Sequence, residues 1–284
     1  MTDQYFSLTA QHHPSDVMGM KYVYPVVSRR AGGVSVGINL NTNHACNWHC
    51  SYCQVPDLQR GAAPPVDVDV LTQELTVLLT QVLQGDFMQR HVPVEARILR
   101  DIALSGDGEP TSAREFATVI ERVGAVMANF GLLGHIPLVV ISNGSQLGKV
   151  RVQAGLRKLA ALGGQLWFKL DSATPHGMRR MNGTRNSPQR QLENLRLAIT
   201  LCPVWIQTCV LAWDGLPPDE SEQAAYLAAV CALAGSGVQG VLLYGLARPS
   251  MQAQAVHLSA LPESWLTHYA QRIETCGVPV KVHL

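Results

Sequence analysis

The chain has 284 residues, of which 47% are hydrophobic and 15% are charged, and its formal net charge is +1. This composition supports a sizeable buried core and argues against disorder, and the near-zero charge argues against a strongly basic nucleic-acid surface. No apolar run reaches the roughly 18–20 residues of a membrane-spanning helix, the N-terminus has no signal-peptide pattern, and seven cysteines form an odd set. We therefore expect a cytoplasmic protein without a membrane segment.

The first 33 residues have no clear periodicity, and we interpret them as an extended arm. Beyond them, short apolar runs alternate with segments of helical period. The predicted strands cover residues 34–40, 101–105, 138–142, 165–171, 204–213 and 238–246, with a further strand at 278–283. The predicted helices cover residues 68–83, 112–129, 150–162, 188–200, 219–234 and 263–276. Ser112 and Ser187 are the predicted N-caps of the second and fourth helices, with Glu115 and Pro188 as supporting signals.

Six strand-then-helix units predict an α/β fold with a parallel sheet and right-handed crossovers. Six units are too few for a complete eight-unit barrel, and periodicity alone leaves an open doubly wound sheet as an alternative. In both architectures the active site lies at the carboxyl ends of the strands. The strand ends are therefore the places to look for functional residues.

The end of the first strand carries three cysteines, Cys46, Cys50 and Cys53, at C-x3-C-x2-C spacing. An odd trio on one short loop cannot form a disulfide framework, but its thiolates can converge on one metal centre. Three cysteine ligands suit a [4Fe–4S] cluster in which the fourth iron has no protein ligand. A structural zinc site that adds His44 or His49 is the alternative.

The spacing of the cysteines, with Tyr52 before the last one, resembles the signature of the radical S-adenosylmethionine (SAM) superfamily. The flanking segments, residues 28–30, 37–40 and 53–54, resemble its wyosine-synthase-like group more closely. The resemblance implies a partial (β/α)6 TIM-like barrel as one core domain over residues 34–284, after the arm of residues 1–33. It also implies that SAM is cleaved reductively to a 5′-deoxyadenosyl radical, with a flavodoxin or ferredoxin as electron donor.

The next two strand ends match positions that contact SAM in this superfamily. Gly108, Glu109 and Pro110 resemble its Gly-Glu-Pro element, which contacts the amino group of SAM. Asn143 begins an Asn-Gly turn, and its side chain either supports that turn or contacts the cofactor. The resemblance places the ring of Tyr52 beside the adenine.

The fourth strand ends with Lys169 and Asp171, which point the same way because they are two residues apart. They either form a structural ion pair or bind SAM, Lys169 at its carboxylate and Asp171 at its ribose. Gln207 on the fifth strand and Arg248 after the sixth are substrate candidates. We interpret Cys209 as a buried hydrophobe, and Cys202, Cys231 and Cys276 as core or surface thiols.

Three hypotheses for function follow. The first is modification of an RNA base, as in the wyosine-like group, although the chain lacks the cysteines for that group's second cluster. The second is radical modification or activation of a small molecule, peptide or protein. The third is a non-catalytic iron–sulfur electron carrier. We expect neither a cobalamin domain before residue 34 nor an appended RNA-binding domain.

Overall fold

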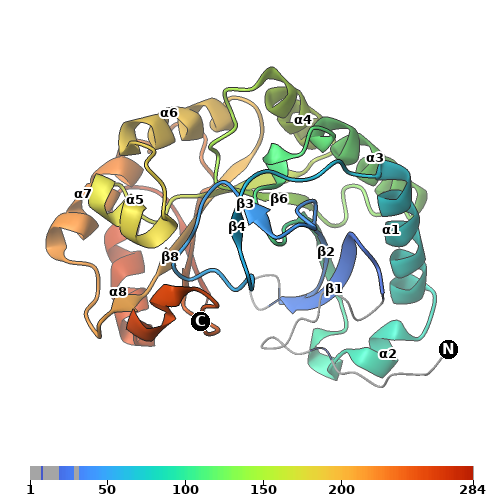
Figure 1. The fold of residues 1–284 in the computed structure, drawn as a ribbon, viewed down its shortest axis with the longest axis horizontal. Coiled ribbons are helices and arrows are strands. Elements are labelled where there is room, and N and C mark those ends of the chain that lie inside the picture. The colour runs from blue at the N-terminus through green and yellow to red at the C-terminus, as the bar shows by residue number, and fades with distance from the viewer. Residues whose placement is uncertain (1–7, 9–18, 29–31, 284) are drawn as a thin grey trace.

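The computed structural model describes Leu8 and residues 19–28 and 32–283 of the chain (Figure 1). Arg29 and Arg30, which contribute to the resemblance, lie outside the described residues. The strands are β1 (Val23–Ser28), β2 (Gly33–Ile38), β3 (Ala45–Cys46), β4 (Gln59–Arg60), β5 (Leu99–Leu104), β6 (Leu138–Ser142), β7 (Gln165–Lys169), β8 (Val204–Val210), β9 (Ala212–Trp213), β10 (Gly240–Gly245), β11 (Leu258–Ser259) and β12 (Val280–His283).

The helices alternate with the strands along most of the chain. The α-helices are α1 (Val68–Leu83), α2 (Phe87–His91), α3 (Phe116–Asn129), α4 (Val150–Ala161), α5 (Pro175–Asn182), α6 (Pro188–Ile199), α7 (Glu220–Cys231) and α8 (Glu263–Glu274). Three short 3-10 helices are η1 (Val94–Ala96), η2 (Pro110–Ser112) and η3 (Ala253–His257). Within the described residues, no helix combines the length and the apolar character needed to cross a membrane.

The main sheet has eight strands in the order β1-β2-β5-β6-β7-β8-β10-β12. β1 is antiparallel to β2, and every other neighbouring pair is parallel. The sheet curls without closing, and the larger helices form an arc around its outer side (Figure 1). The protein is therefore a partial TIM-like barrel, as predicted.

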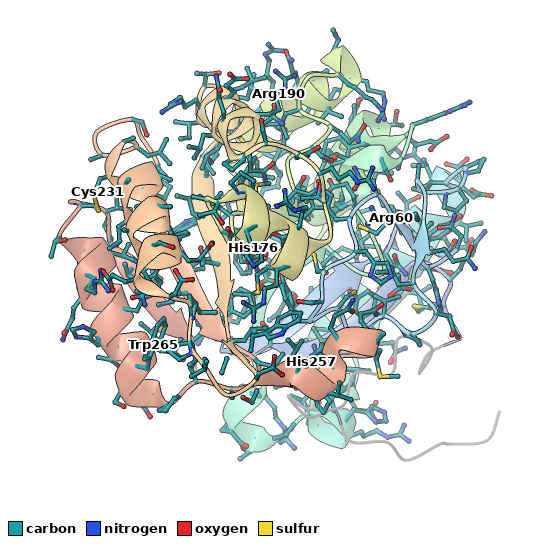
Figure 2. The ribbon with its side chains drawn as sticks, turned by 60° about the vertical axis from the view of Figure 1, so that its left-hand side comes forward. Arg60, His176, Arg190, Cys231, His257 and Trp265 are labelled. Carbon is teal, nitrogen blue, oxygen red and sulfur yellow. A yellow bond between two sulfur atoms is a disulfide. The ribbon has the colours of Figure 1, made fainter. Side chains whose placement is uncertain are left out.

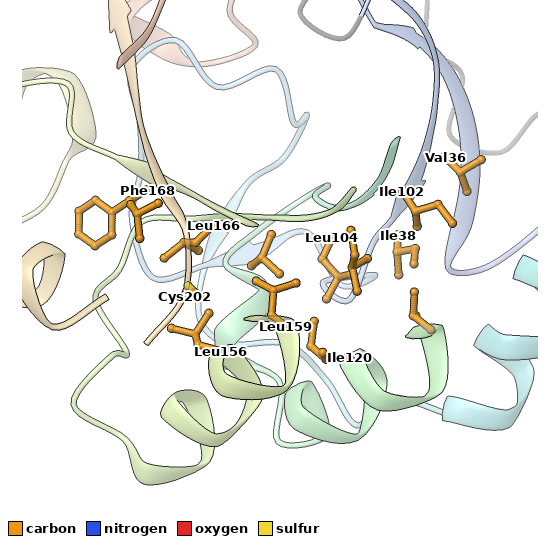
Figure 3. Close-up of a cluster of buried hydrophobic side chains, with 14 of the residues drawn as sticks. Val36, Ile38, Ile102, Leu104, Ile120, Leu156, Leu159, Leu166, Phe168 and Cys202 are labelled. Atoms are coloured by element: carbon orange, nitrogen blue, oxygen red, sulfur yellow. The ribbon is translucent and has the colours of Figure 1, made fainter. Parts of the chain in front are cut away.

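Alternate residues of each strand lie in two separate hydrophobic layers, because successive side chains point to opposite faces of a sheet. Leu166 and Phe168 of β7 pack with the outer helices, beside Ile120 of α3 and Leu156 of α4 (Figure 3). Trp167, between them, belongs to a smaller cluster inside the barrel. The helices thus cover the outer face of the sheet, and side chains of the inner face can line a site.

Two predictions about the first half of the chain need correction. Part of the expected extended arm is strand β1, which pairs with β2 along the edge of the sheet. The helix predicted from residue 112 begins at Phe116, because Pro110 first opens the 3-10 helix η2. Ser112 does not cap that helix; its hydroxyl accepts a hydrogen bond from the backbone N–H of Ala63 at 2.9 Å.

The second half contains a helix that the sequence analysis did not expect. Helix α5 lies within the predicted loop after β7, with Thr174 as N-cap, Pro175 in its first turn and Gly183 in the left-handed region at φ 56°. These are standard helix start and stop signals. The N-cap predicted for the fourth helix is confirmed, since the Ser187 hydroxyl accepts a hydrogen bond from the backbone N–H of Arg190.

Cys231 and Cys276 form a disulfide that joins the end of α7 to the segment after α8 (Figure 2). The prediction that both are thiols is therefore wrong. The two residues are 45 positions apart in sequence, and only the packing of the two helices brings their Cα atoms to 4.6 Å. Cys202 remains a free, buried cysteine, as expected.

Candidate active site at the cysteine loop

A cavity of about 530 Å³ opens at the carboxyl ends of the parallel strands. Its wall includes ten of the twelve residues that the sequence analysis proposed for metal, cofactor or substrate: Cys46, Cys50, Tyr52, Cys53, Gly108, Glu109, Asn143, Lys169, Gln207 and Arg248. The two others, Pro110 and Asp171, are not part of the wall. Residues up to 202 positions apart in sequence, from Cys46 to Arg248, therefore meet at the ends of the strands.

The three cysteines are partly buried and reach the cavity from one loop. Within the described residues, no three His, Cys, Asp or Glu side chains are grouped closely enough to hold a metal ion as they stand. Three thiols from one loop at one cavity are nevertheless the soft donor set that iron–sulfur clusters use. Both ring nitrogens of His44 have partners within the protein: Nδ1 lies 3.2 Å from the Pro56 carbonyl, and Nε2 lies 3.7 Å from Asp107.

Burial dominates the protonation of the cysteines. It raises the pKa of Cys46 to about 12 and that of Cys50 to about 11, and it also raises the pKa of Cys53. Neutral thiols are therefore the stable form at neutral pH without a metal. Because only thiolates bind metal, loading of the site must release protons.

Two separate segments hold the backbone of the cysteine loop. On one side, the N–H groups of His49 and Ser51 donate to the carbonyls of Asn182 and Met181, at the end of α5. On the other side, residues after β10 bind the loop: the Ser250 hydroxyl donates to the Ser51 carbonyl at 2.7 Å. The loop is thus fixed by distant parts of the chain.

The Gln252 amide completes this second contact, donating to the Cys53 carbonyl at 3.3 Å and to the Val55 carbonyl at 2.8 Å. Neither Ser250 nor Gln252 was among the predicted site residues. No residue type or spacing in the sequence marks them as partners of the cysteine loop.

The carboxylate of Glu109 is buried and bonded entirely within the protein. One oxygen accepts from the Ser142 hydroxyl at 2.7 Å and from the N–H and hydroxyl of Thr111, and the other accepts from the Asn143 N–H at 2.7 Å. Burial raises the pKa of Glu109 against the effect of these donors. Its side chain joins the loops after β5 and β6.

The loop after β5 needs a glycine at position 108 because no side chain fits there. A Cβ atom at Gly108 would collide with the Ala45 carbonyl and with the side chain of Asn41. The loop after β5 therefore lies directly against the backbone that leads into the cysteines, and this close contact brings the two predicted motifs together.

Asn143 supports its turn, because its side-chain oxygen accepts a hydrogen bond from the Ser145 N–H at 3.0 Å. Its amide also donates to the side chain of Asn47, within the cysteine loop, at 2.9 Å. Turn chemistry and contact with the site are therefore combined in one side chain.

Lys169 and Asp171 form the ion pair that the sequence analysis considered, with 3.8 Å between Nζ and Oδ2. The ammonium also donates to the Tyr244 hydroxyl at 3.0 Å and lies over the Tyr52 ring, 5.1 Å from its centroid. Burial acts to lower the pKa of Lys169, but the charge of Asp171 and the Tyr244 hydroxyl outweigh it, and the pKa is raised. Lys169 is therefore a largely buried cation, 15% exposed, at the cavity wall.

Asp171 lies behind that wall, and its side chain is fully buried. One oxygen accepts from the Tyr52 hydroxyl at 2.5 Å and from the Asn182 amide at 2.6 Å, and the other accepts from the Cys209 N–H at 2.8 Å. The carboxylate thus orients side chains that reach the cavity.

Gln207 lies beside Lys169 on the neighbouring strand β8. It is 1% exposed, and within the described structure its amide nitrogen has no hydrogen-bond partner. The indole nitrogen of Trp48, also at the cavity, lacks a partner among the described residues too. Buried donors without partners are costly, so a ligand with hydrogen-bond acceptors fits this cavity.

The fold and the site define a class of protein: a partial parallel barrel with a three-cysteine loop at its mouth. A family model described as the radical SAM superfamily matches residues 40–225. The chain belongs to that superfamily.

Solved structures of the same fold include TYW1 with a lysine-pyruvate adduct bound. It is 17% identical, with a TM-score of 0.54, and the match covers 86% of this chain and 74% of TYW1. A radical SAM methyltransferase from Sphaerobacter thermophilus is 13% identical, with a TM-score of 0.61 and coverage of 88% and 66%.

Among curated proteins, the GTPase Obg of Brachyspira hyodysenteriae is 27% identical over 135 residues. The match covers 46% of this chain and 17% of that protein.

Proposed function

We propose that the chain is a radical SAM enzyme in which Cys46, Cys50 and Cys53 bind a [4Fe–4S] cluster. One observation carries the proposal: in a member of this superfamily, three thiols of one loop share a cavity with residues at the ends of the parallel strands. The non-catalytic electron carrier is disfavoured, because a carrier has no need for a cavity of about 530 Å³ at its cluster.

When bound, such a cluster would supply the one electron that breaks a carbon–sulfur bond of SAM, giving methionine and a 5′-deoxyadenosyl radical able to remove a hydrogen atom from the substrate. The protein orients the reactants and excludes water. Lys169 is suited to the SAM carboxylate, and the Tyr52 ring to the adenine. The Glu109 carboxylate is already occupied, so we assign the ammonium to the backbone carbonyls of residues 106–108, which line the cavity.

The electron comes from outside the chain, and we propose a flavodoxin or ferredoxin as its donor. The cysteine loop is the natural point of entry, since the side chains of its three cysteines are only partly buried.

For the substrate, we propose a planar group that carries hydrogen-bond acceptors, with an RNA base as the first candidate. The Gln207 amide needs an acceptor, and the aromatic rings of Tyr52 and Tyr244 line the same cavity. A small molecule, a peptide or a protein side chain is the alternative.

The chemistry is tested by anaerobic reconstitution with iron and sulfide, followed by dithionite and SAM. We expect about four irons per chain and 5′-deoxyadenosine as a product. Cys50→Ala should abolish both, whereas Cys202→Ala, at a buried cysteine away from the cavity, should keep both. An intact, reduced cluster that yields no 5′-deoxyadenosine would refute the proposal.

The substrate class is tested by following deuterium from labelled cell extracts into 5′-deoxyadenosine. Transfer from the RNA fraction alone supports an RNA base. Transfer from the small-molecule or peptide fraction alone supports the alternative. Gln207→Leu should weaken binding of the active fraction, because it removes the unpartnered donor.

A further inference from the structure

The last residue of helix α5, Asn182, contacts both the cysteine loop and the ion pair behind the cavity. Its Nδ2 lies 3.6 Å from the sulfur of Cys50 and 2.6 Å from Oδ2 of Asp171. An amide nitrogen carries two N–H groups. Asn182 can therefore give one N–H to the sulfur and the other to the carboxylate.

The backbone around Asn182 is held against the cysteine loop. The residue is 1% exposed, and its backbone carbonyl accepts a hydrogen bond from the N–H of His49 at 3.0 Å. The next residue, Gly183, lies so close to the His49 carbonyl that a Cβ atom there would collide with it. The end of α5 is thus packed against the cysteine loop.

Asp171 contributes on the other side. Its carboxylate is held by the Tyr52 hydroxyl at 2.5 Å and by the Cys209 N–H at 2.8 Å, so it is a fixed acceptor. Because it takes one N–H of Asn182, the second N–H is left for the sulfur. The arrangement resembles the outer hydrogen bonds that orient ligands in metal sites generally.

We propose that Asn182 is a positioning residue for Cys50, donating a hydrogen bond to its sulfur when the thiolate binds the cluster. The proposal rests on the proposed function, because it assigns Cys50 to the cluster. Reduction adds negative charge to the cluster, and a donor on a ligating sulfur stabilises that charge. Hydrogen bonds to the sulfurs are among the factors that set a cluster's potential.

The test is an anaerobic, EPR-monitored redox titration of the reconstituted wild type and of Asn182→Leu. We expect the variant to keep its iron and to have a lower midpoint potential, with the equilibrium for one-electron reduction weakened about tenfold, or about 59 mV. Asn182→His, which retains an N–H donor, should recover most of the shift. Asn182→Ala replaces the leucine variant if the latter does not fold.

Asn129→Leu is the matched control, because Asn129 is also the last residue of a helix, α3, but is exposed. An intact cluster with an unchanged potential in Asn182→Leu would overturn the assignment of Asn182 alone. So would an equal shift in Asn129→Leu. A wild-type chain that takes up no iron would instead overturn the proposed function, and this proposal with it.

Discussion

Replacing Asp171 by Asn tests how the buried charges behind the cavity are balanced. The change keeps the shape of the side chain but removes its charge, leaving the Lys169 ammonium buried without a counterion. Breaking a buried pair in this way costs about 3–5 kcal/mol. We expect the lower half of that range, since Lys169 keeps its contacts with the Tyr244 hydroxyl and the Tyr52 ring.

The measurement is urea-induced unfolding at pH 7, followed by tryptophan fluorescence, for the wild type, both single variants and the double variant. Lys169→Met should cost less, about 1–3 kcal/mol, because Asp171 keeps three other donors. The double variant should cost less than the sum of the two single changes by at least about 1 kcal/mol, as directly interacting residues do. Additivity within about 0.5 kcal/mol would refute the reasoning.

The pH dependence gives a second check on the same pair. The pKa of Lys169 is raised above its ordinary value of 10.5, so the stabilisation it brings is fully present below pH 10.5. It is lost only as the pH rises through the higher, folded-state value. The difference in unfolding free energy between the wild type and Lys169→Met, which carries no titrating group at this position, should therefore stay constant from pH 7 to about pH 10.

Three further predictions concern other parts of the chain. Ser250→Ala removes the donor to the Ser51 carbonyl, so it should lower the free energy of unfolding in urea by about 1–3 kcal/mol and weaken iron retention. Unchanged values for both would contradict the role of Ser250 in holding the cysteine loop. Burial raises the pKa of Cys202 to about 12. The rate of alkylation at Cys202 in the folded protein should therefore keep rising about tenfold per pH unit above pH 9, whereas the rate for the unfolded chain should level off there. Cys231 and Cys276 should resist alkylation until a reductant is added, as peptide mass spectrometry can show, and reduction should lower the unfolding free energy by up to about 4 kcal/mol for a loop of 45 residues.

The sequence predicted the sheet well because its strands and helices follow local patterns. Buried strands such as β6 read as apolar runs, and the Ser187–Pro188 pair marks the start of α6. Helix α5 was missed although Thr174 and Gly183 mark its ends, because only eight residues, four of them polar or charged, lie between them. Short helices of this kind depend on tertiary contacts more than on periodicity.

The candidate site was predicted as a set of residues but not as a network. Strand ends identify side chains that share one edge of a sheet, and this rule placed Lys169 and Gln207 at one cavity. It gives no information on partners. Asn182 is 132 residues from Cys50, and Ser250 is 199 residues from Ser51. Such contacts follow from the packing of loops, which the sequence pattern does not encode.

The two attachments of the cysteine loop also determine when during synthesis the site can be completed. The loop is made early, but the segments that hold it, around Asn182 and Ser250, leave the ribosome much later. Until then Cys46, Cys50 and Cys53 belong to an unfinished loop whose carbonyls lack their final donors. Iron delivered to the nascent chain would meet three unplaced thiols, so the proposed cluster should assemble only after the segment around Ser250 has been made.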